Sequence, residues 1–485
     1  MNSNKVFSNL IWRFSERIGV KLISTVVSLI LARILAPEAF GTVTIVLVIT
    51  DILQVFVESG FGTALIQKKD ADDLDFSSVF FFNIVIGIFL YILLFILAPW
   101  ISTIYSKPEL KSIIRAVGLI LIIAGLRNVQ QAYVSRNMLF RRFFFSTLGG
   151  TIAGAVVGIL MALKGFGVWA YVVQYLVNNA VGTAILWITV KWRPKAEFSI
   201  ERFKGLFSYG WKLLVSSVLN TISDKLRQLV IGMKYDSSSL SFYNYGVVFP
   251  NLIVENVNTS IDSVLLPALS SEQDKKENVK AMTHRAIQVS SFIMWPLMLG
   301  LLAVSEPMVA LILGPDWAPC VPFIRIFCIY YALFPIHTAN LNAIKAIGRS
   351  DIFLKLEIIK KVLDFAIVII TLFIGVKAMA IGLLLEGIVN LFINSVPNSK
   401  LIDYNFFEQI KDILPSMLLA TVMCGACLAL TLTGMGNFLT VIIQIIIGAA
   451  VYIGGAYLFK LDTLFYVLKI VKNLFSRGEN GEASA

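Results

Sequence analysis

Ionisable side chains recur at helical spacing inside stretches of the sequence that are otherwise apolar. In residues 9–35, Arg13, Arg17 and Lys21 follow one another at intervals of four residues, which places them on one face of a helix. An ionised group in a lipid-embedded helix costs roughly 2.5–3.5 kcal/mol, so it faces either an opposite charge or a hydrated cavity. The spacing therefore predicts a polar face that is turned away from lipid.

Three other apolar stretches carry a polar stripe of the same kind. The residues of these stripes are Asp51, Gln54 and Glu58 in 39–66; Lys212, Ser216, Asn220, Asp224, Lys225, Arg227 and Gln228 in 203–232; and Asn251, Glu255, Asn258 and Asp262 in 239–266. We expect the four stripes to face one central, hydrated cavity. The sequence leaves open the alternative that these charges pair with one another and only hold the helices together.

The stretches that carry these residues are long enough to cross a membrane. The chain of 485 residues is 57% hydrophobic and 15% charged, whereas a soluble domain has roughly 25% charged residues. With about 20 apolar residues per span, we predict an all-α integral membrane protein with about fourteen transmembrane helices. The predicted spans are 9–35, 39–66, 76–100, 110–135, 142–163, 166–190, 203–232, 239–266, 281–303, 320–344, 352–374, 377–399, 411–432 and 437–459.

Lysine and arginine are unevenly distributed between the loops. If the N-terminus is cytoplasmic, the cytoplasmic segments hold about 26 of these residues and the opposite segments about 5. This asymmetry explains the net charge of +11 without nucleic-acid binding. It predicts a multi-pass protein of the cytoplasmic membrane with both termini on the cytoplasmic side.

The order of spans and loops indicates two related halves. The acidic stripe of 39–66 aligns with that of 239–266 at an offset of about 204 residues, and weak internal symmetry is usual in secondary transporters. We therefore predict two parallel six-helix lobes around a central cavity, followed by two C-terminal helices. The expected segments are an N-terminal lobe in 1–192, a cytoplasmic linker in 193–204, a C-terminal lobe in 205–400, two helices in 401–460 and an amphipathic cytoplasmic tail in 461–485.

Other features favour structural roles, and none indicates an enzyme. Cys424 and Cys427 form a CxxC inside an apolar span, where helix packing explains them better than redox chemistry. The chain has only two histidines, His284 and His337, which argues against a zinc site. No GxxxxGK[ST] loop is present, so we expect no cofactor and no bound metal, and a transport cycle would use H⁺ or Na⁺ rather than ATP.

Two predictions concern packing at the membrane. Arg33, Arg115 and Arg127 lie near the ends of predicted spans, and we expect their side chains to extend to the membrane interface. Glycines at 150, 154 and 158 form a small-residue face that favours close helix packing.

Several motifs resemble those of a known family. The motifs are Leu31–Gly41, Gly60–Asp70, Phe80–Asn83, Leu313–Trp317 and Ala346–Asp351. Together they resemble the polysaccharide transporter family, which includes the Wzx-type flippases, and are most similar to its colanic-acid exporter branch. The likeness runs from about residue 10 to about residue 400. It implies the fold of the multidrug/oligosaccharidyl-lipid/polysaccharide (MOP) superfamily.

The resemblance also implies an activity and roles for the polar stripes. The activity is translocation of a polyprenyl-diphosphate-linked oligosaccharide for polysaccharide export, with membrane lipid, a polymerase and chain-length proteins as partners. The residues that would contact the diphosphate and glycan are Arg17, Lys21, Lys212, Asn220, Lys225 and Arg227. The carboxylates that would couple transport to an ion, or gate it, are Asp51, Glu58, Asp224, Glu255 and Asp262. A closed ion pair, for example between Asp51 and Lys212, is the alternative for such carboxylates.

Three other functions remain open from the sequence alone. They are a cation-coupled multidrug exporter, a lipid II flippase and a membrane-embedded glycan polymerase or ligase. The last fits least well, because the longest external stretch, 304–318, contains only Glu306 and Asp316 as ionisable residues. The transported glycan, the coupling ion and the oligomeric state are not determined by the sequence.

Overall fold

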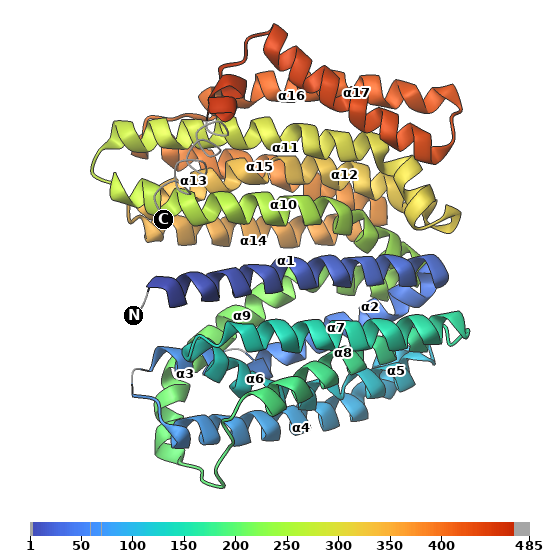
Figure 1. The fold of residues 1–485 in the computed structure, drawn as a ribbon, viewed down its shortest axis with the longest axis vertical. Coiled ribbons are helices and arrows are strands. Elements are labelled where there is room, and N and C mark those ends of the chain that lie inside the picture. Colours follow the sequence, from blue (N-terminus) through green and yellow to red (C-terminus); the bar gives the residue numbers. More distant parts are fainter. Residues whose placement is uncertain (1–2, 59, 69, 470–485) are drawn as a thin grey trace. The chain divides into compact units, whose positions relative to one another are not determined.

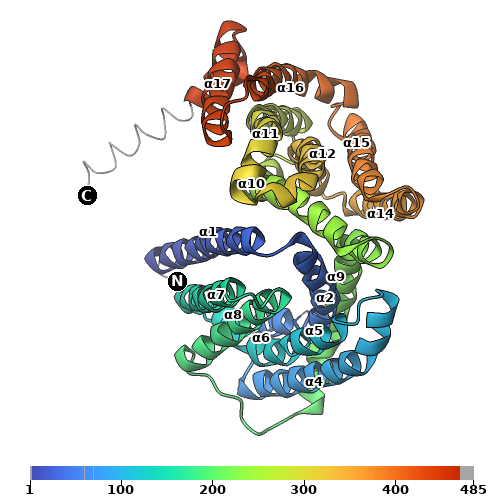
Figure 2. The same ribbon diagram turned by 90° about the vertical axis from the view of Figure 1, so that its right-hand side faces the viewer.

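The computed structural model describes residues 3–58, 60–68 and 70–469, without the side chains of 3–18, 209 and 212. These residues form helices joined by short loops and divide into two compact units, Met1–Ser241 and Phe242–Ala485. Within each unit, most helices run roughly along one direction, seen from the side in Figure 1 and closer to end-on in Figure 2. The prediction of an all-α fold is confirmed in the described part of the chain.

The first unit contains the helices up to α9 and the start of α10. Their bounds are α1 (Ser3–Ile34), α2 (Pro37–Glu58), α3 (Phe61–Gln67), α4 (Asp73–Ile104), α5 (Leu110–Val117), α6 (Ile120–Arg136), α7 (Phe140–Leu163), α8 (Val168–Thr189), α9 (Ile200–Lys234) and α10 (Ser237–Ser271). The closest packing is between α7 and α8. A Cβ atom on Gly150 would lie 2.4 Å from the Asn178 carbonyl oxygen, so the predicted small-residue face of α7 is confirmed.

The second unit contains the rest of α10 and the helices that follow. Their bounds are α11 (Lys276–Ile312), α12 (Val321–Ala332), α13 (Phe334–Ala346), α14 (Ser350–Leu372), α15 (Val376–Leu401), α16 (Phe406–Ala429) and α17 (Asn437–Leu458). A short 3₁₀ helix, Pro315–Cys320, precedes α12. α11 packs against α12, α13, α16 and α17, and therefore forms the centre of this unit.

The structure has a helix at each predicted span, but not all are apolar enough to be recognised as membrane-crossing by composition. Ten helical segments of the described chain meet that criterion. Predicted spans 39–66, 110–135 and 320–344 are each built from two consecutive helices. The other four long helices are α1, α9, α10 and α14, which carry many ionisable or amide residues. The total of about fourteen spans therefore stays a prediction.

The boundary between the compact units differs from the predicted boundary between lobes. α9 packs against α2, α3 and α4 and so belongs to the first unit. The predicted linker, 193–204, is also attached to that unit, because the backbone N–H groups of Lys195 and Ser199 each donate to a serine hydroxyl of α4 at 3.0 Å. The lobe assignment rests on the sequence repeat and stays a prediction.

The predicted amphipathic tail lies only partly within the described residues. A helix begins at Asp462 and continues to Lys469. The guanidinium of Arg285, in α11, lies 4.4 Å from the centre of the Tyr466 ring. Residues 470–485 of the predicted tail lie outside the described part of the chain.

Candidate functional site

An ion pair joins two of the predicted polar stripes within the first unit. The Asp51 carboxylate of α2 lies 2.9 Å from the Lys225 ammonium of α9, and each side chain is about one-third exposed. The pairing of stripes that the sequence left open is therefore observed here. Asp51 thus has Lys225 as a partner, and the pair of Asp51 with Lys212 falls on a side chain that is not among those described.

A second ion pair lies farther along α2, near its C-terminal end. The Glu58 carboxylate is 2.8 Å from the guanidinium of Arg127, in α6. Arg127 also donates to the side-chain oxygen of Asn179, in α8, at 2.7 Å. Arg127 lies in the middle of α6 and binds two partners within its own unit. Its predicted position at the membrane interface stays a prediction.

The other stripe residues of the first unit differ in their exposure. Lys21, Asn220 and Asp224 have exposed side chains, and that of Arg227 is half-buried. The side chain of Arg17, like that of Lys212, is not among those described. The assignment of the six predicted substrate-binding residues to one cavity therefore stays a prediction.

A cavity of about 360 Å³ lies beside Glu58, between α2, α3, α6 and α7. Its polar lining residues are Glu58, Thr63, Asn128, Gln131, Ser135 and Thr147. Hydroxyl and amide groups of this kind both donate and accept hydrogen bonds. The cavity can therefore bind a polyhydroxylated ligand, and it contains one of the residues predicted from the sequence.

Two glycines explain how the chain forms this cavity. Gly60 connects α2 to α3 with a φ of +88°, and an added Cβ atom would lie 2.3 Å from the Gly210 carbonyl oxygen of α9. Gly62 leaves room for Asn128, whose side-chain oxygen would be 2.9 Å from a Cβ atom at position 62. Asn128 is then fixed by donating to the Val57 carbonyl oxygen at 2.9 Å. The Gly60–Asp70 motif thus has a structural role at the cavity.

Sequence reasoning missed most of the lining of this cavity. Asn128 and Gln131 follow Arg127 in a polar run inside the predicted span 110–135, and Ser135 lies one turn farther on. An interior run of polar residues at this spacing indicates a polar helix face. The prediction of site residues was instead based on the four stripes, which contain more charged residues.

In the second unit, the stripe of α10 contacts α13 through two parallel hydrogen bonds. The hydroxyl of Thr338 donates to the Asn258 side-chain oxygen at 2.8 Å. The amide of Asn342 donates to the Asp262 carboxylate at 2.8 Å. Asp262 thus binds a neutral group, unlike Glu58, and it has no ion-pair partner among the residues that the structure covers. Glu255 is exposed.

The cysteines and titratable side chains give no indication of a metal centre. In the part of the chain that the structure describes, no group of three or more His, Cys, Asp or Glu residues is placed to hold a metal ion. Cys424 and Cys427 are buried, and the Cys427 thiol lies 3.3 Å from the Gln444 carbonyl oxygen of α17. These contacts agree with the packing role that the sequence predicted.

Comparison with known proteins shows similarity to polysaccharide transport proteins. A family model described as "Polysaccharide biosynthesis protein" matches residues 30–322. The chain is 25% identical to the succinoglycan biosynthesis transport protein ExoT of Rhizobium meliloti, over 75% of this chain and 73% of that protein. It is 24% identical to the lipopolysaccharide biosynthesis protein WzxC of Escherichia coli, over 85% and 82% of the two chains.

Comparison with solved structures identifies the fold. The inward closed conformation of the lipid II flippase MurJ has a TM-score of 0.76 and 17% identity, over 93% of this chain and 99% of that chain. The inward-facing conformation of a multidrug resistance MATE family transporter of the MOP superfamily has a TM-score of 0.60 and 16% identity, over 81% and 98%. The chain therefore has the fold of these transporters.

Proposed function

Because the chain belongs to the polysaccharide biosynthesis protein family, we propose that it translocates a polyprenyl-diphosphate-linked glycan unit across the cytoplasmic membrane. The match over residues 30–322 carries this proposal, and the similarity to a succinoglycan biosynthesis transport protein, ExoT, and a lipopolysaccharide biosynthesis protein, WzxC, supports it. The unit would serve export of an O-antigen, a capsule or an exopolysaccharide. A polymerase and chain-length proteins would be its downstream partners.

The glycan of such a substrate requires a hydrated path lined by hydrogen-bonding groups, because hydrocarbon about 30 Å thick offers it none. The cavity beside Glu58 supplies hydroxyl and amide groups from α3, α6 and α7. In the predicted orientation, the C-terminal end of α2 faces the cytoplasm, where lipid-linked glycans are assembled. We assign this cavity to the first contact with the sugars.

The diphosphate requires cationic partners in the same interior. Charge-assisted hydrogen bonds to phosphate are about twice as strong as neutral ones. Among the basic residues predicted to contact the diphosphate, Lys225 forms an ion pair with Asp51. The diphosphate would take the place of Asp51 on Lys225, so that this pair opens when substrate enters. Arg17, Lys21, Lys212 and Arg227 are further candidates, with Asn220 as a polar contact.

Energy for repeated transport would come from an ion gradient or the membrane potential. Asp51 and Glu58 each bind a cation, which suits a gate that exchanges ion-pair partners. Asp262 binds only a neutral amide, so it is the better candidate to take up H⁺ or Na⁺. Asp224 and Glu255, which like Asp262 are exposed, are further candidates.

Reconstitution into proteoliposomes tests the proposed substrate. The purified protein is mixed with a polyprenyl-diphosphate-linked oligosaccharide, with lipid II and with a cationic dye in parallel assays. Translocation of the oligosaccharide above protein-free vesicles is the expected result. Translocation of lipid II alone would favour the lipid II flippase, and efflux of the dye alone would favour a drug exporter. The MurJ and MATE folds do not distinguish these alternatives, because similarity at this identity shows only the fold.

A further inference from the structure

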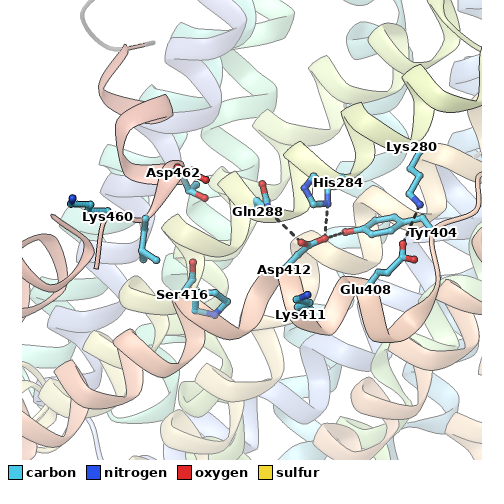
Figure 3. A pocket seen from close by; sticks show the side chains of 13 residues that line it. Lys280, His284, Gln288, Tyr404, Glu408, Lys411, Asp412, Ser416, Lys460 and Asp462 are labelled. Carbon is cyan, nitrogen blue, oxygen red and sulfur yellow. Dashed lines mark hydrogen bonds and ion pairs between the residues drawn. The ribbon is translucent and has the colours of Figure 1, made fainter. Parts of the chain in front are cut away.

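A ladder of charged contacts joins one end of α11 to the start of α16 and the loop before it. We call it the α11–α16 ladder, and it consists of three pairs of side chains. Lys276 lies 2.9 Å from Asp403, Lys280 lies 3.2 Å from Glu408, and His284 lies 2.6 Å from Asp412. The three basic residues are spaced four apart in α11, so they share one face of that helix. Figure 3 shows the second and third pairs from close by.

Asp412 is the most highly coordinated carboxylate of the ladder. It accepts hydrogen bonds from the Tyr404 hydroxyl and, at 3.3 Å, from the Gln288 amide, besides its contact with His284 (Figure 3). Its side chain is only 13% exposed, whereas that of His284 is 40% exposed. Burial, together with the hydrogen bond to Asp412, raises the pKa of Tyr404, so this hydroxyl stays protonated and remains a donor. Two neutral donors therefore hold Asp412 whatever the state of His284.

The ladder borders a cavity of about 500 Å³ through which water and protons can reach His284. The charged groups that face it come from each element around it. They are Lys280 and His284 from α11; Glu408, Lys411 and Asp412 from α16; and Lys460 and Asp462 after α17. Histidine is the only side-chain type among them that ordinarily gains or loses a proton near neutral pH. The pair of His284 and Asp412 is therefore the contact of the ladder whose charge can depend on pH near neutrality.

We propose that His284 and Asp412 form a proton-binding site that controls how firmly the start of α16 is held on α11. When the imidazole binds a proton, the contact is an ion pair with a largely buried carboxylate. When the proton leaves, Asp412 keeps its neutral donors but loses the one charged partner that it has among the described residues. Histidine is the side chain whose ordinary titration falls in this range. The ladder therefore weakens as the pH of the water in the neighbouring cavity rises from about 6 to about 8.

The position of the site gives this change a wider effect. α16 packs along α11, and α17 packs on both, so the ladder anchors one end of a helical hairpin. Next to the ladder, Gln409 of α16 exchanges two amide hydrogen bonds with Asn340 of α13, at 2.7 and 3.0 Å. Asn398 of α15 also donates to Asn340, at 2.7 Å. Movement at the start of α16 is thus transmitted to the centre of the second unit. The proposal requires nothing of the transported substrate.

Hydrogen-exchange mass spectrometry of the full chain in lipid nanodiscs tests the site. The readout is exchange in peptides covering 404–416, for the native protein and for His284→Asn, compared at the same pH so that the intrinsic exchange rate cancels. Asparagine can keep the hydrogen bond of Nδ1 to Asp412 but cannot gain a charge. We expect His284→Asn to exchange about threefold faster than the native protein near pH 6, and equally fast near pH 8.

Lys280→Gln is the matched control, because its ion pair with Glu408 lies one turn away on the same two helices. It should change exchange by the same factor at both pH values. Asp412→Asn is the second test of the site, and its ratio to the native protein should also depend on pH. Equal ratios for His284→Asn at the two pH values would overturn the proposal, as would a pH-dependent ratio for Lys280→Gln of the same size.

Discussion

The ion pair of Asp51 and Lys225 is largely shielded from solvent, so removal of one partner leaves a charge without its counterion. We predict that Asp51→Asn or Lys225→Gln alone lowers the melting temperature, and that the double variant recovers part of the loss. The cost should be below the roughly 3–5 kcal/mol of a fully buried pair, because each side chain is about one-third exposed. Thermal unfolding of the three purified variants measures this.

The exposed pair of Lys195 and Asp73 provides the comparison for that experiment. Its atoms are 3.1 Å apart, but both side chains are more than half exposed. Lys195→Gln should therefore change the melting temperature very little. If Asp51→Asn were equally silent, the pair in the interior would contribute nothing to stability.

The cavity beside Glu58 leads to a prediction about transport rather than stability. Gln131→Leu replaces the amide by an apolar side chain of comparable size and removes its hydrogen-bonding groups, so we expect reduced glycan export at an unchanged protein level. Export in cells that lack their own flippase, normalised to membrane protein, is the measurement. Thr189→Val serves as control, because the exposed Thr189 hydroxyl bonds only within its own helix. Full export by Gln131→Leu would remove this residue from the substrate path.

At the scale of elements, the connection between α2 and α3 depends on Gly60. Gly60→Ala would require both a left-handed backbone and a Cβ atom 2.3 Å from the Gly210 carbonyl oxygen, so we predict a severe loss of folded protein. Gly165→Ala is the matched control, because Gly165 has a φ of +79° but no neighbouring atom within 4 Å of an added Cβ. Backbone strain alone should cost about 1–2 kcal/mol. Size-exclusion chromatography of both variants distinguishes the clash from the strain.

The start of α4 predicts a dependence on acid. The Asp72 side chain caps the helix by accepting from the Asp75 backbone N–H at 3.0 Å, and this bond and Arg202 lower the pKa of Asp72 below 3.8. A carboxyl whose pKa is depressed by folding stabilises the protein above its unfolded pKa, and this contribution is lost as the pH falls through the folded value. In Asp72→Asn the asparagine side chain can still cap the helix, but it has no proton to gain or lose.

The native melting temperature should therefore fall more steeply than that of Asp72→Asn below about pH 4. Melting curves of both proteins between neutral and acidic pH make the comparison. The effect should be modest, because the Asp72 side chain is 49% exposed. Parallel curves down to the lowest pH would show that the cap does not depend on the charge.

For the whole molecule, the loop charges predict where each segment lies. Reporter fusions at residue 198 and at the C-terminus should read cytoplasmic, and a fusion at residue 236 should read external. A C-terminus outside the cytoplasm would refute the predicted topology, and an external fusion at residue 198 would refute the cytoplasmic access of the cavity beside Glu58.

The sequence predicted the fold well, because apolar length and charge at helical spacing are local properties. α1, α9 and α10 were recognised as polar-striped helices from spacing alone. The partners of the stripe residues were not predictable in this way, since the pairing of Asp51 with Lys225 depends on how α9 packs against α2. The contact of His284 with Asp412 was missed for the same reason. Complementary charges at four-residue spacing in α11 and α16 were its only local signal.

The distance along the chain between Asp51 and Lys225 also has a consequence for biosynthesis. Ribosomes add roughly 5–20 residues per second, and Lys225 follows Asp51 by about 170 residues, so Asp51 waits roughly 9–35 s for its partner. During that time its carboxylate adds roughly 2.5–3.5 kcal/mol to the cost of membrane insertion. The apolar remainder of the segment, with a mean hydropathy of 2.1 in its most apolar part, must outweigh this cost. The apolar residues of α2 therefore have a second role: they keep the segment in the membrane until Lys225 has been synthesised.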